Sequence, residues 1–268
     1  MADIVVAAGT SHILMSPNGI EEASDRVFDG MIKVGRAVRA AKPDVIFIIS
    51  NDHQFNLDLS VKDQFLVATD DGFTPFGEMD IPLEPFPGKA DFAREFVEFA
   101  SGKGVDAVAF EGLRPDHGTA VPLLFSNPGH DIPVVPLLVN LAADTAPDAK
   151  ECWKAGEVLG SFIRDQRPEG ERVAIVAAGG LSHWVGFDDL GINEEFDHKF
   201  LKDVGNGDYD YWVNLPMAEI EKQSGNGGLE IVNWLMMAAA VNGAKGETVF
   251  YEPMPEWMTG MGGVLMQL

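Results

Sequence analysis

Short apolar runs alternate with segments of helical periodicity over the first part of the chain. The run Asp3–Ala8 ends at a glycine and is typical of a strand buried on both faces. From Ile20 to Ala41, apolar residues recur every three or four positions, which predicts an amphipathic helix that Pro43 ends. A second apolar run, Asp44–Ile49, follows. These residues predict a strand, a helix and a strand joined as a right-handed βαβ unit.

The alternation continues along the chain. We expect further helices and strands at Ala90–Gly102 (helix), Ile132–Val139 (strand), Ala149–Asp165 (helix) and Arg172–Ala178 (strand). The segment Thr69–Gly88 holds several prolines and glycines and predicts a long loop that lines or covers a pocket. Beyond Gly191 helices dominate, before a strand-like Glu247–Tyr251 and a tail rich in methionine and glycine.

Together these elements predict an α/β fold. We expect a single catalytic domain over residues 1–268, built on a mixed, largely parallel central sheet that is flanked by helices. In open sheets of this kind, ligands bind beyond the carboxyl ends of the strands. The active site is therefore expected there.

The charge of the chain narrows the classes of partner. With 19 basic and 42 acidic residues, the formal net charge is -23, which repels phosphate backbones and anionic lipid. Nucleic acid and membranes are therefore not expected partners. An anionic substrate would need local positive charge or a bound metal cation at the site.

The N-terminus and the cysteine content favour a cytoplasmic protein. Met1–Ala8 lacks the basic and apolar regions of a signal peptide, and no apolar stretch reaches membrane-spanning length. Cys152 is the only cysteine, so the fold does not depend on an internal disulfide.

Three of the six histidines lie a few residues beyond predicted buried strands. They are His12, His53 and His183. Because the carboxyl ends of parallel strands meet at one edge of the sheet, loops there can bring these side chains together. Another histidine, His117, lies in a glycine-bearing loop, where a side chain can face a pocket.

A carboxylate begins a predicted helix that is apolar almost all round. Glu230 follows a glycine-rich stretch and precedes Ile231–Val241, so its charge is costly without a partner. A metal would supply that partner, and the helix N-terminus favours the ionised form. Two histidines and a carboxylate form the facial arrangement of non-haem Fe(II) oxygenases, but zinc hydrolases use the same ligands. Residue types alone leave both metals open.

Other polar residues are given simpler interpretations. His130 and His198 are expected to be solvated, and Asn51 and Asp52 are expected to serve the turn after a strand. The glycines Gly225–Gly228 do not form a phosphate loop, since no Gly-Lys-Ser/Thr follows them.

Five short motifs occur in order over most of the chain: Thr10-Ser-His12, Asn51-Asp-His53, Asp116-His-Gly118, Gly179-Gly-Leu-Ser-His183 and Gly227-Gly-Leu-Glu230. In this order and spacing they resemble the class III extradiol ring-cleavage dioxygenases, the family of the protocatechuate 4,5-dioxygenase beta subunit. The resemblance implies Fe(II) held by His12, His53 and Glu230. It also implies that His183 is the acid/base toward the bound diol and that His117 assists from the opposite side.

The implied reaction is extradiol cleavage of a catechol-type substrate with O2. A carboxylated ring such as protocatechuate, gallate or O-methylgallate is expected, although no residue selects among them. An imidazole that titrates near neutrality suits removal of the protons of a diol. The resemblance also allows a small helical partner subunit or a homo-oligomer. Two alternatives remain: a zinc-dependent hydrolase on the same ligands, and a metal-free binding protein of the same fold.

Overall fold

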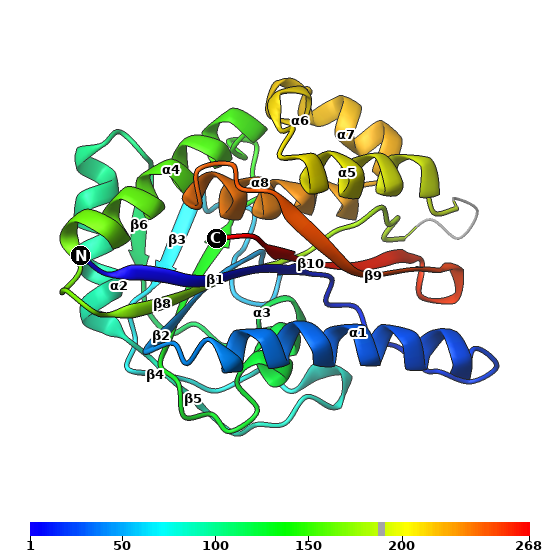
Figure 1. The fold of residues 1–268 in the computed structure, drawn as a ribbon, viewed down its shortest axis with the longest axis horizontal. Helices are drawn as coiled ribbons and strands as arrows, with labels where there is room; N and C mark the ends of the chain where they lie inside the picture. The colour runs from blue at the N-terminus through cyan, green and yellow to red at the C-terminus, as the bar shows by residue number, and fades with distance from the viewer. Residues whose placement is uncertain (187–190) are drawn as a thin grey trace.

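An eight-stranded mixed sheet, flanked by helices on both faces, forms the centre of the computed structural model, which describes residues 1–186 and 191–268 (Figure 1). The strand order is β6-β3-β7-β2-β8-β1-β10-β9. The strands are β1 (Asp3–Thr10), β2 (Val45–Ser50), β3 (Phe65–Ala68), β6 (Ala107–Phe110), β7 (Val134–Val139), β8 (Arg172–Ala178), β9 (Gly246–Met254) and β10 (Thr259–Met266). A separate two-stranded sheet pairs β4 (Gly72–Phe73) with β5 (Phe86–Pro87).

The helices cover the two faces of the sheet unequally. They are α1 (Glu21–Ala40), α2 (Ala90–Gly102), α3 (His117–Ser126), α4 (Ala149–Gln166), α5 (Glu194–Asn206), α6 (Asp210–Asn214), α7 (Met217–Ser224) and α8 (Ile231–Ala240). Short 3-10 helices in the described ranges are η1 (Glu78–Asp80), η2 (Gly227–Glu230) and η3 (Pro255–Trp257). Figure 1 shows α4 and α8 on one side of the sheet and α1 on the other.

Four central strands run parallel, so their carboxyl ends meet at one edge. β2 pairs in parallel with β7 and β8, and β8 pairs in parallel with β1. Outside these four strands, β3 is antiparallel to β7 and parallel to the edge strand β6, and β10 is antiparallel to both β1 and β9. The predicted mixed, largely parallel α/β sheet is confirmed.

The predicted buried helix after Glu230 is confirmed as α8. All ten residues of α8 are buried, and α8 packs with α4 against the sheet. The ring of Trp234 lies so close to β1 that a Cβ on Gly9 would be 2.7 Å from it, so only glycine fits there without movement. The indole Nε1 of Trp234 donates to the carbonyl of Gly179 at 3.0 Å. This packing fixes α8, and the glutamate that precedes it, relative to β1 and β8.

Several elements were not predicted from the sequence. The methionine- and glycine-rich tail is β10, a buried strand between β1 and β9. Its glycines make room for neighbours, because a Cβ on Gly262 would lie 2.8 Å from Leu181 and one on Gly263 would lie 2.4 Å from Phe250. The short strands β3 and β6, together with α3, were also missed. The predicted loop Thr69–Gly88 contains β4, η1 and β5.

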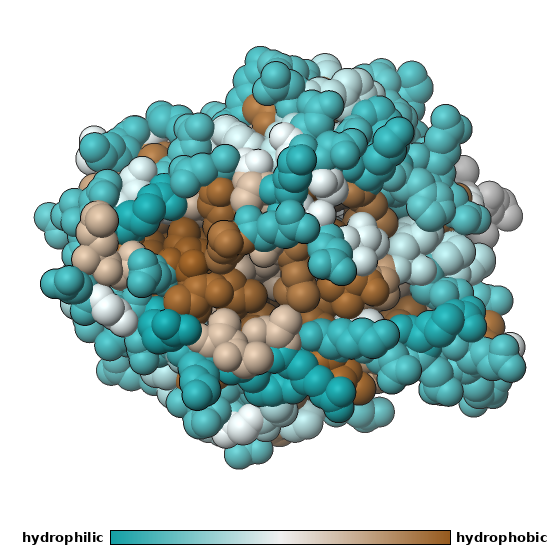
Figure 2. Space-filling view, in the orientation of Figure 1, coloured by the Kyte–Doolittle hydropathy of each residue, from teal (hydrophilic) through white to brown (hydrophobic). Residues whose placement is uncertain are grey.

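On the face drawn in Figure 2, apolar side chains gather over the middle, where Figure 1 places β1, β9 and β10, and the periphery is hydrophilic. These strands carry partly buried apolar residues such as Ile4, Val249 and Leu265. Across the two described ranges, no helix is both long and apolar enough to cross a membrane.

Candidate functional site

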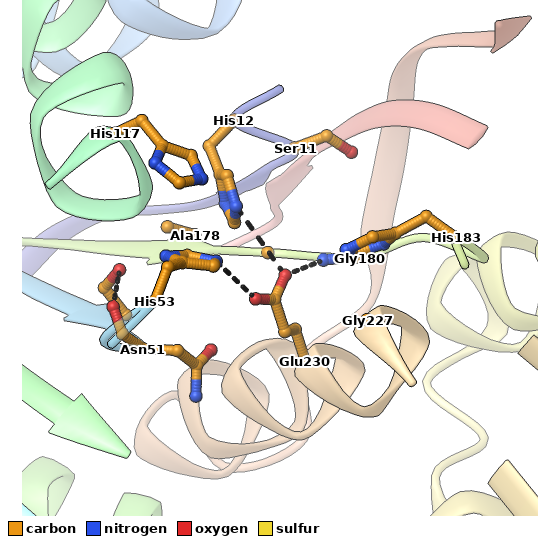
Figure 3. Close-up of polar contacts among 12 residues, drawn as sticks. Ser11, His12, Asn51, His53, His117, Ala178, Gly180, His183, Gly227 and Glu230 are labelled. Carbon is orange, nitrogen blue, oxygen red and sulfur yellow. Dashed lines mark hydrogen bonds and ion pairs between the residues drawn. The ribbon is translucent and has the colours of Figure 1, made fainter. Parts of the chain in front are cut away.

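Loops at the carboxyl ends of β1 and β2 and the start of α8 bring three predicted site residues together. The Nε2 atom of His53 lies 3.0 Å from Oε1 of Glu230, and Nε2 of His12 lies 3.8 Å from Oε2 of the same carboxylate. Figure 3 shows both imidazoles directed toward this carboxylate. Residues separated by more than 170 positions along the chain, such as His53 and Glu230, therefore form one cluster.

Glu230 is an ionised carboxylate in a buried position. Burial alone would raise its pKa, but the neighbouring histidines, His12 and His53 above all, hold that pKa well below its ordinary value. Oε2 also accepts a hydrogen bond from the backbone N–H of Gly180 at 3.2 Å. A Cβ on Gly179 would lie 2.6 Å from the Cβ of Glu230, so the glycine turn after β8 leaves room for this side chain.

His53 is oriented by a buried aspartate. Asp116 Oδ2 accepts from the backbone N–H of His53 at 2.7 Å and lies 3.0 Å from its Nδ1. Because an ionised carboxylate only accepts, Nδ1 donates to Asp116, and Nε2 likewise donates to Oε1 of Glu230 in the metal-free protein. Burial lowers the pKa of His53, but the hydrogen bonds to Asp116 and Glu230 outweigh it and raise that pKa to about 10. The sequence offered Asp116 only as part of a motif and gave it no role.

His12 provides the test of whether the cluster suits a metal ion. Its side chain is 1% exposed, and neither ring nitrogen has a hydrogen-bond partner among residues 1–186 and 191–268. Burial lowers its pKa to about 3, so the ring is neutral and offers a lone pair. An unpartnered buried polar group costs about 1–3 kcal/mol. A cation between His12, His53 and Glu230 would give one of these two nitrogens a partner, so the donor set fits a metal.

His117 lies beside this cluster at the start of α3. Its ring centroid is 4.2 Å from that of His53 and 5.4 Å from that of His12. One ligand atom from each of the three histidines lies within 4.8 Å of the others, so distance alone also permits His117 as a ligand. Burial, followed by the charge of His53, lowers the pKa of His117.

His183 approaches from the side opposite His53 and His117 (Figure 3). It is 4% exposed and lies in the loop after β8. Its Nδ1 is 3.1 Å from the carbonyl of Leu181, which can only accept, so Nδ1 carries the proton and Nε2 is the basic nitrogen. The backbone N–H of His183 donates to Ser224, and its carbonyl accepts from Gly227. The loop is thus tied to the segment that leads into α8.

A buried carboxylate supports the same loop. Asp197, on α5, accepts from the backbone N–H and the hydroxyl of Ser182, both at 2.8 Å, and from the hydroxyl of Tyr251 at 2.9 Å. Burial raises the pKa of Asp197 to about 6. The residue next to His183 is therefore held by α5 and β9.

Gly227 is the position on which the placement of His183 depends most directly. A Cβ there would lie 1.8 Å from Nε2 of His183, while the backbone of Gly227 is helical and accepts alanine. Gly227→Ala should therefore displace the imidazole and lower kcat about a hundredfold, since a displacement near 1 Å can cost that much. Oxygen-uptake kinetics at matched metal content measure the effect.

Gly102→Ala is the matched control, because a Cβ on that helical glycine would meet no described atom within 4 Å. We expect Gly102→Ala to keep the wild-type kcat. A Gly227→Ala protein with wild-type kcat would show that the observed position of His183 is not required for turnover.

The remaining polar candidates are structural in their contacts. Asn51 donates to Val139 at 2.7 Å and accepts from Asn233 at 2.6 Å, so it ties β2 to β7 and α8. Asp52 accepts from the backbone N–H of Asn56 and of the residue after it, in the turn that follows β2.

The two other histidines lie outside the cluster. His198 is exposed and packs against Tyr251, as expected of a solvated residue. His130 is half-buried and stacks on the ring of Phe86 with centroids 4.0 Å apart, so the prediction that it is simply solvated was wrong. The sequence alone could not show that Phe86 lies beneath it.

The fold and this cluster define an α/β protein whose histidines and glutamate at the carboxyl edge of the parallel strands could hold a metal ion. Residues 6–262 match the protein family described as the catalytic LigB subunit of aromatic ring-opening dioxygenase. The chain belongs to this family of extradiol-type dioxygenases, as the sequence motifs predicted.

Sequence identity to individual relatives is low. The chain is 31% identical over 191 residues to gallate dioxygenase of Pseudomonas putida, an alignment that covers 69% of this chain and 55% of that protein. It thus spans about half the length of that relative. It is also 22% identical over 278 residues to the 2,3-dihydroxyphenylpropionate/2,3-dihydroxicinnamic acid 1,2-dioxygenase of Klebsiella pneumoniae, covering 85% of this chain and 87% of that protein.

A solved structure confirms the fold. The crystal structure of an uncharacterized protein from Escherichia coli K12 superimposes with a TM-score of 0.61 at 15% sequence identity. The match covers 98% of this chain and all of that one. The shared architecture therefore extends over the whole sheet and its helices.

Proposed function

We propose that this chain is an Fe(II)-dependent extradiol dioxygenase that opens the ring of a catechol-type substrate with O2, as one catalytic domain. The observation that carries the proposal is the buried cluster of His12, His53 and Glu230, in which both ring nitrogens of His12 lack hydrogen-bond partners within the described part of the chain. This donor set is the two-histidine, one-carboxylate arrangement of non-haem Fe(II) oxygenases. Family membership supplies the class of reaction.

In this proposal His12, His53 and Glu230 hold the iron, and His117 does not. Glu230 is preferred as the third ligand because its ionised carboxylate supplies the negative charge that a divalent cation requires. Bound Fe(II) would provide an electron path between the aromatic ring and O2. Asp116 keeps Nε2 of His53 directed at the metal position, and Nε2 would release its proton when the metal binds.

The proposed acid/base residues flank the cluster. His183 has its proton on Nδ1, so Nε2 is free to accept a proton from a substrate hydroxyl. His117, on the opposite side, would assist with a second proton or hydrogen bond. Two protons must leave a catechol that binds through both oxygens, and two imidazoles on opposite sides match that need.

The proposed substrate is a carboxylated catechol such as protocatechuate, gallate or O-methylgallate. The names of both relatives denote aromatic acids that carry adjacent hydroxyls. The acidic net charge of this chain makes a bound cation important for such a substrate. The proposed macromolecular partner is a small helical subunit or a second copy of the chain.

The test is anaerobic loading with Fe(II), followed by oxygen-electrode and absorbance assays across protocatechuate, gallate, 3-O-methylgallate, catechol and dihydroxyphenylpropionate. We expect oxygen uptake with a ring-opened product for at least one carboxylated catechol. Turnover without oxygen by a zinc-loaded protein would instead indicate a hydrolase. Failure to bind either metal would indicate a metal-free binding protein.

A further inference from the structure

We propose that Glu78 is a positioning residue that fixes the orientation of His117, an inference that rests on the proposed function of His117 beside the iron. Glu78 Oε1 accepts a hydrogen bond from the backbone N–H of His117 and lies 3.3 Å from its Nδ1. The same oxygen therefore holds both the first residue of α3 and its ring.

The contact determines which nitrogen faces the metal cluster. An ionised carboxylate only accepts hydrogen bonds, so Nδ1 of His117 donates its proton to Glu78. The other ring nitrogen of His117, the unprotonated Nε2, then lies on the side of the ring away from Glu78. His53 and His183 show the same pattern, since an acceptor binds Nδ1 in each: Asp116 for His53 and the Leu181 carbonyl for His183. Three histidines at this site are thus held through Nδ1 by different parts of the chain.

Glu78 lies in the segment that connects β4 to β5, outside the eight-stranded sheet. The strand pair holds the base of this segment, where Gly72 pairs with Pro87. Near its start, two residues before Glu78, the backbone N–H of Phe76 donates to the carbonyl of Pro115 at 3.0 Å, and the guanidinium of Arg114 lies 4.4 Å from the centroid of the Phe76 ring. The segment is therefore fixed against the residues that immediately precede His117.

Both partners are mostly enclosed. The side chains of Glu78 and His117 are 18% and 12% exposed. At such a poorly exposed place, water is a poor substitute for the lost hydrogen-bond partner. Removal of the Glu78 carboxylate should therefore let the imidazole of His117 rotate. We infer that Glu78 acts on turnover through His117, and not through the metal.

The experiment is a double-mutant cycle on kcat for oxygen uptake, at matched iron content. Glu78→Ala should lower kcat about tenfold or more with little change in KM, because a misplaced acid/base group loses proton transfer before it loses substrate binding. Glu78→Gln should stay near wild type, since its amide oxygen still accepts from both nitrogens. In the His117→Ala background, Glu78→Ala should cause no further loss. Glu84→Ala, at an exposed glutamate of the same segment, is the control.

A second readout does not require activity. In metal-free protein, ¹⁵N NMR of the histidine side chains, assigned with His117→Ala, should show a protonated Nδ1 at His117 in wild type and Glu78→Gln, and a changed signal in Glu78→Ala. An equal loss of kcat in the wild-type and His117→Ala backgrounds, or an unchanged His117 signal, would overturn the inference. If no catechol is turned over by wild type, the proposed function fails, and the NMR comparison still decides whether Glu78 orients His117.

Discussion

Turnover of a catechol should fall about 10²- to 10⁴-fold in His183→Ala, with iron still bound, because general acid/base groups contribute in that range. His183 lies outside the cluster of His12, His53 and Glu230, so its removal leaves all three proposed ligands in place. The substitution removes the imidazole whose Nε2 is proposed to accept the substrate proton. Oxygen uptake and the iron content of the same sample, measured together, test this separation.

Added imidazole provides a sharper version of this test. Removing the ring leaves space beside Gly227, whose missing side chain already makes room for Nε2 of His183. Free imidazole should therefore restore part of the turnover of His183→Ala, whereas it should not affect His198→Ala, the control at an exposed histidine. Full activity of His183→Ala without imidazole would contradict the acid/base role.

Iron binding and turnover should both be lost in Glu230→Gln. The amide keeps the shape of the side chain but removes the only negative charge among the proposed ligands. In wild type, Fe(II) at about a hundredfold excess over its Kd should stabilise the fold by about 2.7 kcal/mol. Anaerobic thermal unfolding with and without Fe(II) measures this gain, which Glu230→Gln should lack. Glu221→Gln, at an exposed glutamate on α7, should retain it.

His12→Leu separates loss of metal binding from loss of folding. Both ring nitrogens of His12 are buried without partners among the residues the structure describes, and each such group costs about 1–3 kcal/mol in the metal-free protein. The leucine variant should therefore be at least as stable as wild type without metal, yet show no rise in melting temperature with Fe(II). A wild-type rise in His12→Leu would remove His12 from the ligand set.

The sequence by itself determined the class of fold and the side of the sheet on which the chemistry lies. The runs Asp3–Ala8, Asp44–Ile49 and Arg172–Ala178 are apolar enough to be strands buried on both faces, and they are β1, β2 and β8. Because parallel strands share a carboxyl edge, histidines after β1 and β2 could be expected to meet. They do, together with Glu230.

Only the tertiary structure decided how those side chains are held. Asp116 is 63 positions from His53, and Glu78 is 39 positions from His117, so no local pattern links the members of either pair. β10 was missed for a related reason: its glycines look like a flexible tail until the side chains that occupy their space are known. Contacts between distant segments depend on how the elements pack together, and apolar periodicity records only which face of each element is buried.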